Sequence, residues 1–320
     1  MRRRHLLGAI MAAGMPLPPA RAQWRPDRPV RWIVPFTAGG PTDLVGRLLA
    51  ERLAARWGQP VVVENRPGAG TVVANTAIAR SAPDGLTLGM TISAFTLNPV
   101  LRSSLPYDTL RDIAPVTQLA ISPVVLAAHR GLAADSLPEM VALARRTEGG
   151  LAYGTAGVGT LSHLVMELLA RRAGVRLVHV PYPGFAQSLP DLMQGRIAMI
   201  TDVWGGMRPH VQSGEMKVLG VAGKAPVPGA PGLPRMADTY PEIDVSSSFG
   251  LIAAAGTPAP VLERIAADIR AVLHLPEVQA RMTEFGMVPV GSTPAEYAAW
   301  VRADLERWQR VVREANIRVE

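Results

Sequence analysis

The order of apolar and polar positions predicts strands that alternate with helices from residue 31 onward. Val45, Leu49, Leu53 and Trp57 recur at every fourth position, so they form the apolar face of a helix. Short apolar runs before and after this helix have the length and composition of buried strands. The expected strands cover residues 31–36, 61–65 and 87–92, and the expected helices cover 43–58 and 71–82. Such alternation indicates a mostly parallel sheet with helices on its faces.

The same alternation begins again after residue 122. Ser136 and Glu139 have the S-x-x-E spacing of a capping box, which predicts a helix start. Leu161, Leu164 and Leu168 share one face of a further amphipathic helix. The expected strands cover 123–129, 151–156, 176–182, 197–202 and 217–223, and the expected helices cover 136–146, 160–174 and 184–194. A second α/β unit therefore spans the middle of the chain.

The last third predicts a proline- and glycine-rich surface loop over 225–235, a strand over 247–256 that returns to the first unit, and two closing helices. The first helix places Leu262, Ile265, Ile269 and Leu273 inward. The second opens with the capping box Thr293–Glu296 and buries Tyr297, Val301, Trp308 and Val311. A chain of 320 residues is long enough for two lobes, each with its own core.

Residues 1–22 have the composition of an export signal. A basic start is followed by a short apolar stretch and by Ala20-Arg21-Ala22, an A-x-A cleavage site. Arg3 and Arg4 also fit a twin-arginine signal, so both export routes remain open. We expect a mature chain that begins at Gln23, is soluble and lies in the periplasm, without a lipid anchor because the sequence has no cysteine.

Charge and composition exclude several classes of protein. Removing the four signal arginines lowers the formal net charge from +7 to +3, and no basic block is interleaved with aromatic residues, so we expect no nucleic-acid partner. The absence of cysteine excludes disulfides and thiol catalysis. No G-x-S-x-G, H-E-x-x-H or P-loop motif occurs, and GTAGVG at 154–159 lacks the dinucleotide-binding order of glycines. We therefore expect no catalytic residues, cofactor or metal. We also expect a monomer.

Both halves contain a strand that ends in a glycine-rich loop leading into a helix N-terminus, at Phe36–Asp43 and at Gly154–His163. The unpaired N–H groups and partial positive charge of a helix N-terminus suit a carboxylate, and glycine allows its close approach. Since ligands of open α/β sheets bind beyond the carboxyl ends of strands, both loops are expected to face one crevice. Alternatively, each loop merely turns the chain.

Further polar side chains could complete such a site. Thr160, Ser162 and His163 begin the second helix and could donate to an oxyanion, although Thr160 could act only as an N-cap and His163 could pack on the surface. Thr91 and Ser93 follow a strand, where such hydroxyls often bond their own backbone. Asp202 ends a strand and could bind a ligand amine or water, or cap the next segment.

Eight segments occur in the order seen in one family: IVPFTAGGPTD (33–43), GQPVVVENRPGAG (58–70), APDGLTL (82–88), LPYD (105–108), YGTAGVGTLSHL (153–164), HVPYPG (179–184), DLMQGRI (191–197) and FGLIAAAGTP (249–258). With these segments the chain resembles the substrate-binding receptors of tripartite tricarboxylate transporters, also called Bug or TctC-like proteins. The resemblance covers essentially the whole mature chain, and VENRPGAG together with HVPYPG is specific to the family.

This resemblance implies a type II periplasmic binding fold, a Venus flytrap of two α/β lobes joined by two crossing strands, without catalysis. The lobes would comprise residues 23–124 plus 251–320 and residues 125–250. A small carboxylate ligand would bind between them and be delivered to the permease subunits of a tripartite tricarboxylate-type membrane transporter. The implied ligand-binding residues are Phe36, Thr37, Gly39, Gly40, Thr42, Asp43, Thr155, Ala156, Gly157, Thr160, Ser162, His163 and Asp202.

Three departures from the family pattern suggest a partly apolar or aromatic ligand. The segment TISAFT (91–96) places Phe95 near the cleft, Pro183 stands where lysine is frequent, and Val203 and Trp204 stand where a polar residue is common. An alternative function is a ligand sensor that signals to a membrane sensor kinase, because such a sensor would use the same cleft. A third possibility is an exported hydrolase.

Overall fold

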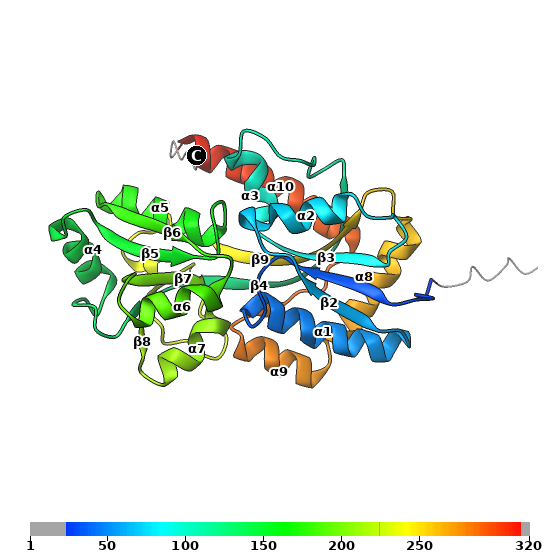
Figure 1. The fold of residues 1–320 in the computed structure, drawn as a ribbon, viewed down its shortest axis with the longest axis horizontal. Coiled ribbons are helices and arrows are strands. Elements are labelled where there is room, and N and C mark those ends of the chain that lie inside the picture. The colour runs from blue at the N-terminus through cyan, green and yellow to red at the C-terminus, as the bar shows by residue number, and fades with distance from the viewer. Residues whose placement is uncertain (1–23, 224, 315–320) are drawn as a thin grey trace, which may run out of the picture.

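The structure is a computed structural model that describes residues 24–223 and 225–314 (Figure 1). The expected export signal at residues 1–22 lies outside the described residues. Two α/β lobes lie side by side, and their strands form one continuous sheet in the order β2-β1-β3-β9-β4-β7-β5-β6, with β8 and β10 also paired to β4. No helix in the described part is long and apolar enough to cross a membrane.

The first lobe is built on parallel strands, because β1 pairs in parallel with both β2 and β3. Val45, Leu49 and Leu53 of α1 are fully buried against this sheet, as the helical spacing predicted. The elements of this lobe are β1 (Val30–Val34), α1 (Pro41–Trp57), β2 (Val61–Asn65), the short 3-10 helix η1 (Ala69–Thr71), α2 (Val72–Ala79), β3 (Thr87–Ile92), β9 (Ser246–Ala254), α8 (Ala259–Leu273), α9 (Pro276–Glu284) and β10 (Val288–Pro289).

The second lobe repeats this plan, with β5 parallel to β6 and β7. Its helix α5 buries Leu161, Leu164 and Leu168 in the lobe core, and α4 begins at the expected cap, where Ser136 accepts a hydrogen bond from the Glu139 N–H. The elements are α4 (Leu137–Arg146), β5 (Leu151–Thr155), α5 (Leu161–Ala173), β6 (Leu177–Pro181), α6 (Phe185–Met193), β7 (Met199–Val203), α7 (Trp204–Gln212), β8 (Met216–Ala222) and the 3-10 helix η2 (Met236–Asp238).

Strand β4 (Ile113–His129) connects the lobes. Its first part, Ile113–Pro123, pairs with β9, and its second part, Val124–His129, pairs with β7 and β8. The chain therefore enters the second lobe along β4 and returns along β9, which is antiparallel to both β4 and β3. These two adjacent strands are the crossing strands of a two-lobed binding-protein fold.

Two helices brace the junction on one side of the sheet. Helix α3 (Ala94–Leu101) packs along α10 (Pro294–Glu314), and the Thr96 hydroxyl donates to the buried carboxylate of Asp304 over 2.6 Å. Toward its end α10 leaves the first-lobe core, because Trp308 and Val312 belong to the same apolar cluster as the second-lobe helix α5 (Figure 1). The C-terminal helix thus contacts the cores of both lobes.

The structure adds elements that the apolar pattern did not reveal. Helix α3 lies in a segment for which no helix was predicted. The first ten residues of β4 extend an expected strand that began at Pro123, and α9 makes three closing helices where two were expected. Pro276 starts α9 directly after α8 ends, so the break between them is a proline-initiated helix start. Val311, expected to be buried, is only partly buried, and its neighbour Val312 takes the inward position.

We predict that Gly250→Ala destabilises the fold by about 1–3 kcal/mol, the usual cost of overpacking a core. A Cβ atom at Gly250, in the middle of β9, would lie 1.8 Å from the Tyr297 hydroxyl oxygen of α10. Tyr297 is itself fully buried and has little room to move. Urea unfolding of the mature chain measures the loss.

Gly232→Ala is the matched control, because a Cβ atom there meets nothing within 4 Å. Its unfolding midpoint should equal that of the wild type. Equal midpoints for the two variants would contradict the packing of α10 onto β9.

Candidate functional site

A small cavity lies between the lobes at the carboxyl ends of the strands. The predicted site residues that line it are Phe36, Gly40, Thr42, Ala156, Thr160, Ser162 and Asp202. The remaining lining residues are Pro41, Ile92, Leu161, Phe185, Val203, Ser247 and Phe249. The cavity leaves about 30 Å³ for the centres of water-sized molecules, which is room for roughly two waters. The two lobes are therefore closed against each other.

The first-lobe loop is held by side chains that lie outside the cavity. Asp43 accepts hydrogen bonds from the Gly39 N–H over 3.0 Å and from Arg47 Nε over 2.9 Å. Asn65 donates to Asp43 Oδ1 and to the Phe36 carbonyl oxygen, each over 2.8 Å. Burial alone would raise the pKa of Asp43, but these bonds outweigh it and hold that pKa below its ordinary value. Asp43 and Asn65 thus fix the loop that carries Phe36.

The loop places the first turn of α1 at the cavity. Pro41 occupies the first helical position, and the Leu44 N–H makes the first helical bond, to the Gly40 carbonyl oxygen. The N–H groups of Thr42 and Asp43 therefore have no acceptor within the helix. Because Gly40 and Thr42 line the cavity, this first turn presents unpaired donors and the positive end of the helix dipole to it.

The second-lobe loop presents the start of α5 from the opposite side. Thr160 is the N-cap of α5, where its hydroxyl accepts from the His163 N–H and donates to the Gly157 carbonyl oxygen over 2.8 Å. This hydroxyl is engaged within the loop, so the N–H groups of Leu161 and Ser162 are the donors that remain. The two helix N-termini flank the cavity from opposite lobes.

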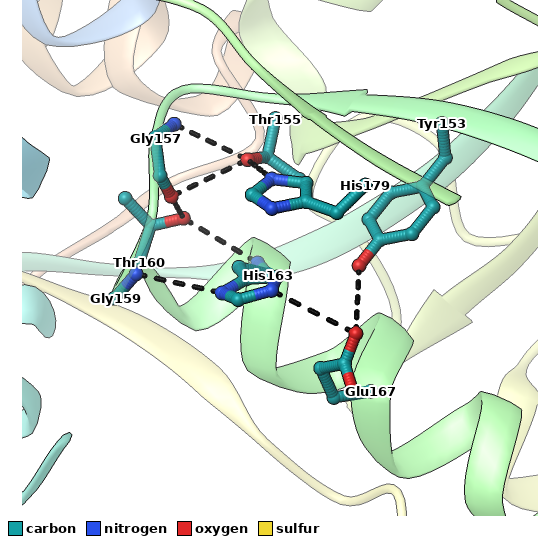
Figure 2. Close-up of polar contacts among 8 residues, drawn as sticks. All are labelled: Tyr153, Thr155, Gly157, Gly159, Thr160, His163, Glu167 and His179. Carbon is teal, nitrogen blue, oxygen red and sulfur yellow. Dashed lines mark hydrogen bonds and ion pairs between the residues drawn. The ribbon is translucent and has the colours of Figure 1, made fainter. Parts of the chain in front are cut away.

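A ring cluster lies behind the second-lobe loop (Figure 2). His163 stacks on His179 with ring centroids 3.9 Å apart, and His179 stacks on Tyr153. His163 faces Gly159 and Glu167 and does not line the cavity (Figure 2). Burial lowers the pKa of His163 to about 4, and burial together with the nearby His163 lowers the pKa of His179 to about 3. Both rings are therefore neutral at pH 7.

Asp202 is the penultimate residue of β7 and is the one ionisable side chain among the described residues that line the cavity. Its Oδ1 accepts a hydrogen bond from the Val203 N–H over 2.7 Å. Burial raises the pKa of Asp202 to about 6, an effect that this bond only partly offsets. The carboxyl group is placed to accept from, or donate to, a polar group of a bound molecule.

Other predicted site residues lie around the cavity without lining it. Thr37 reaches Gln187 of the other lobe, and Ser93 accepts from the Ser248 N–H over 2.9 Å. Thr91 is buried within β3. The further predicted residues that support the loops from behind are Gly39, Asp43, Thr155, Gly157 and His163.

The apolar walls differ from those that the sequence suggested. Phe95 is only 1 % exposed and packs in the first-lobe core, so the expectation that it lies near the cleft is wrong. Trp204 likewise packs in the second-lobe core, whereas its neighbour Val203 lines the cavity. Phe185 and Phe249 supply the aromatic surface instead. Phe185 directly follows the HVPYPG segment, so its place at the cavity could have been predicted from that segment. The place of Phe249 could not, because Phe249 lies on β9, whose partner strands are known only from the fold.

No group of three or more His, Asp or Glu within residues 24–223 and 225–314 could hold a metal ion. The candidate site is thus a cavity flanked by the N-termini of α1 and α5.

Comparison with known proteins shows the family and the fold. Residues 45–317 match the sequence model of the tripartite tricarboxylate transporter family receptor. The chain is similar to the structure of the periplasmic binding protein BugD, with 30 % identity and a TM-score of 0.87 over 92 % of this chain and 99 % of that one.

Two further solved structures hold ligands. Rpa4515 of R. palustris, with adipate, is 30 % identical with a TM-score of 0.86 over 92 % of this chain and 99 % of its own. MatC from Rhodopseudomonas palustris, with bound malate, is 32 % identical with a TM-score of 0.84 over 90 % of this chain and 99 % of its own. The chain is a solute-binding receptor and not an enzyme, and it belongs to the tripartite tricarboxylate transporter receptor family.

Proposed function

We propose that this receptor captures a small carboxylate in the cavity between its lobes and delivers it to the membrane permease of a tripartite tricarboxylate-type transporter. The observation that carries this proposal is the pair of helix N-termini, of α1 and α5, that flank one cavity from opposite lobes. We further propose that residues 1–22 direct export and that the mature protein acts in the periplasm.

A carboxylate suits this arrangement for an electrostatic reason. No lysine, arginine or histidine occurs among the described residues that line the cavity, so the positive potential comes from backbone N–H groups. Each helix N-terminus contributes about 0.3–1 kcal/mol to anion binding at an exposed site. Charge-assisted hydrogen bonds in a site without bulk water add to this. The adipate and malate bound to the two relatives are both dicarboxylates, whose two ends would match two helix N-termini.

Closure of the lobes follows from the same geometry. We propose lobes of residues 23–124 plus 251–320 and residues 125–250, which move about the crossing strands β4 and β9. Residues of both lobes line the cavity, which as it stands has room for roughly two waters. A dicarboxylate therefore enters when the lobes part, and the lobes close around it with a wider cavity than this one. A ligand that contacts both loops then favours the closed form by its greater affinity for that form.

The closed form is held by contacts between the lobes. Arg102 of α3 donates to the Ala69 carbonyl oxygen of its own lobe and to the Val158 carbonyl oxygen of the other lobe, over 3.0 and 3.3 Å. Gly70 lies so close that an added Cβ would be 2.1 Å from the Val158 oxygen. A glycine at position 70 is therefore required for the lobes to meet.

We expect a carboxylate to stabilise the mature chain in a thermal unfolding screen. At about 100 times its dissociation constant, a ligand adds roughly 2.7 kcal/mol, which raises the melting temperature by several degrees. The panel contains malate, adipate, citrate, amino acids and benzoate, with the corresponding amides and alcohols as uncharged controls. A shift caused only by the uncharged compounds would contradict carboxylate recognition.

We predict that Gly70→Ala weakens binding of the best carboxylate in that screen at least tenfold, a loss of about 1.4 kcal/mol. The matched control is Gly58→Ala, because Gly58 has a similar positive φ of 68° against 58° for Gly70, but nothing within 4 Å of its added Cβ. The two variants share the backbone strain, and only Gly70→Ala obstructs closure. Calorimetry measures the affinities, and equal values for both variants would refute the closure contact.

A further inference from the structure

The loop from Thr155 to Thr160 combines ligand-facing residues with unusual backbone freedom. Gly157 and Gly159 have φ values of 124° and 81°, in the region that favours glycine. Glycine loses more conformational freedom on ordering than any other residue. A loop that must be ordered by its ligand would bind less tightly than one already held in place. The supports of this loop therefore bear directly on affinity.

One end of the loop is held by His179 of β6. His179 Nε2 lies 2.6 Å from the Thr155 hydroxyl oxygen, and that oxygen also accepts from the Gly157 N–H over 3.2 Å (Figure 2). The imidazole thus reaches the loop backbone through one side chain. His179 does not line the cavity, so it acts on the site only through Thr155.

The other end of the loop is held by His163 of α5. Its Nδ1 accepts from the Gly159 N–H over 3.5 Å, and its backbone N–H donates to the Thr160 hydroxyl over 3.4 Å. An accepting Nδ1 places the ring proton on Nε2, which lies 3.7 Å from Glu167 Oε1. This hydrogen bond requires a neutral His163 imidazole, because a protonated Nδ1 could not accept from the Gly159 N–H.

The stacked rings of His163 and His179 connect the two ends of the loop. The His163 and His179 rings are inclined by 16° with centroids 3.9 Å apart, and Tyr153 of β5 also stacks on His179, with centroids 5.1 Å apart. The titratable groups that contact the pair are Tyr153, which stacks on His179, and Glu167, which lies 3.7 Å from His163 Nε2 and accepts from the Tyr153 hydroxyl. Burial keeps both imidazoles uncharged, which avoids repulsion within the stack.

We propose that His179 is a positioning residue for the binding site: together with His163 it forms a clamp that holds the loop from Thr155 to Thr160 in its ligand-binding conformation. The inference rests on the proposed function, because it assigns that loop to the ligand. It extends that function to a residue that makes no contact with the cavity.

Two substitutions separate the hydrogen bond from the ring packing. His179→Phe keeps an aromatic ring for the stack but has no atom that can bond Thr155. His179→Gln loses the ring but places an amide group near the position of Nε2. We expect His179→Phe to weaken binding of malate or adipate at least tenfold, and His179→Gln to remain within about threefold of the wild type. Calorimetry on the mature chain provides the affinities, and thermal unfolding provides the stabilities.

Hydrogen exchange of the ligand-free protein tests the clamp without any ligand. In His179→Phe, amides of residues 155–160 should exchange faster, while those of the matching first-lobe loop, residues 36–43, should not change. Wild-type exchange rates in His179→Phe would overturn the proposal. If neither malate nor adipate binds the wild type, the choice of carboxylate fails, and the exchange experiment still decides the clamp.

A double-mutant cycle with Thr155→Val completes the test. If His179 acts through the Thr155 hydroxyl, the double variant should bind no more weakly than the weaker single variant. If the losses of affinity of the two single variants multiply in the double variant, His179 acts by another route and the proposal is overturned. The proposal would also be overturned if, in both His179 variants, the loss of stability accounted for the whole loss of affinity.

Discussion

The antiparallel pairing of β4 with β9 is the interaction on which the rest of the structure depends. Its register runs from Ile113 opposite Ala254 to Pro123 opposite Ser246, through the centre of the sheet. Beyond Pro123, β4 exchanges this partner for β7 and β8. The carboxyl ends of the strands in the two lobes consequently face each other across the same strand pair. Without this pairing the glycine loops would belong to two unrelated sheets.

The two halves of the site follow one physical plan. In each lobe a helix N-terminus offers backbone N–H donors to the cavity, and the positions of these donors depend on how the preceding loop is held. Asp43 and Asn65 hold the first loop by hydrogen bonds, whereas Thr155, His163 and His179 hold the second. Both sets of supporting side chains point away from the cavity. The shape of the candidate site thus depends on polar residues that do not line the cavity.

Much of the site was readable from the chain. The glycine loops predicted the residues that line the cavity from α1 and α5, because helix N-termini after strands have a fixed place in an α/β sheet. Asp202 was recognised as a strand-end carboxylate that could face a ligand. The role of His179 was not recognised, since its partners Thr155 and His163 are distant in sequence and are joined only by the pairing of β5 with β6. Phe95 was misplaced because an apolar residue after a strand has no sequence signal that separates a core position from a cleft position.

The sequence by itself determined the alternating elements, the two-lobed class and the positions of both glycine loops, because hydrophobic period and local capping are encoded within a few residues. Only the tertiary structure decided which apolar side chains form the cavity walls and which form the cores. Phe249 lines the cavity while Phe95 is buried beneath α10, although both are aromatic residues near the crossing strands. The physical reason is that burial depends on the packing of segments far apart in the chain, such as β9 against β4 and α10 against α3. No local pattern contains that information.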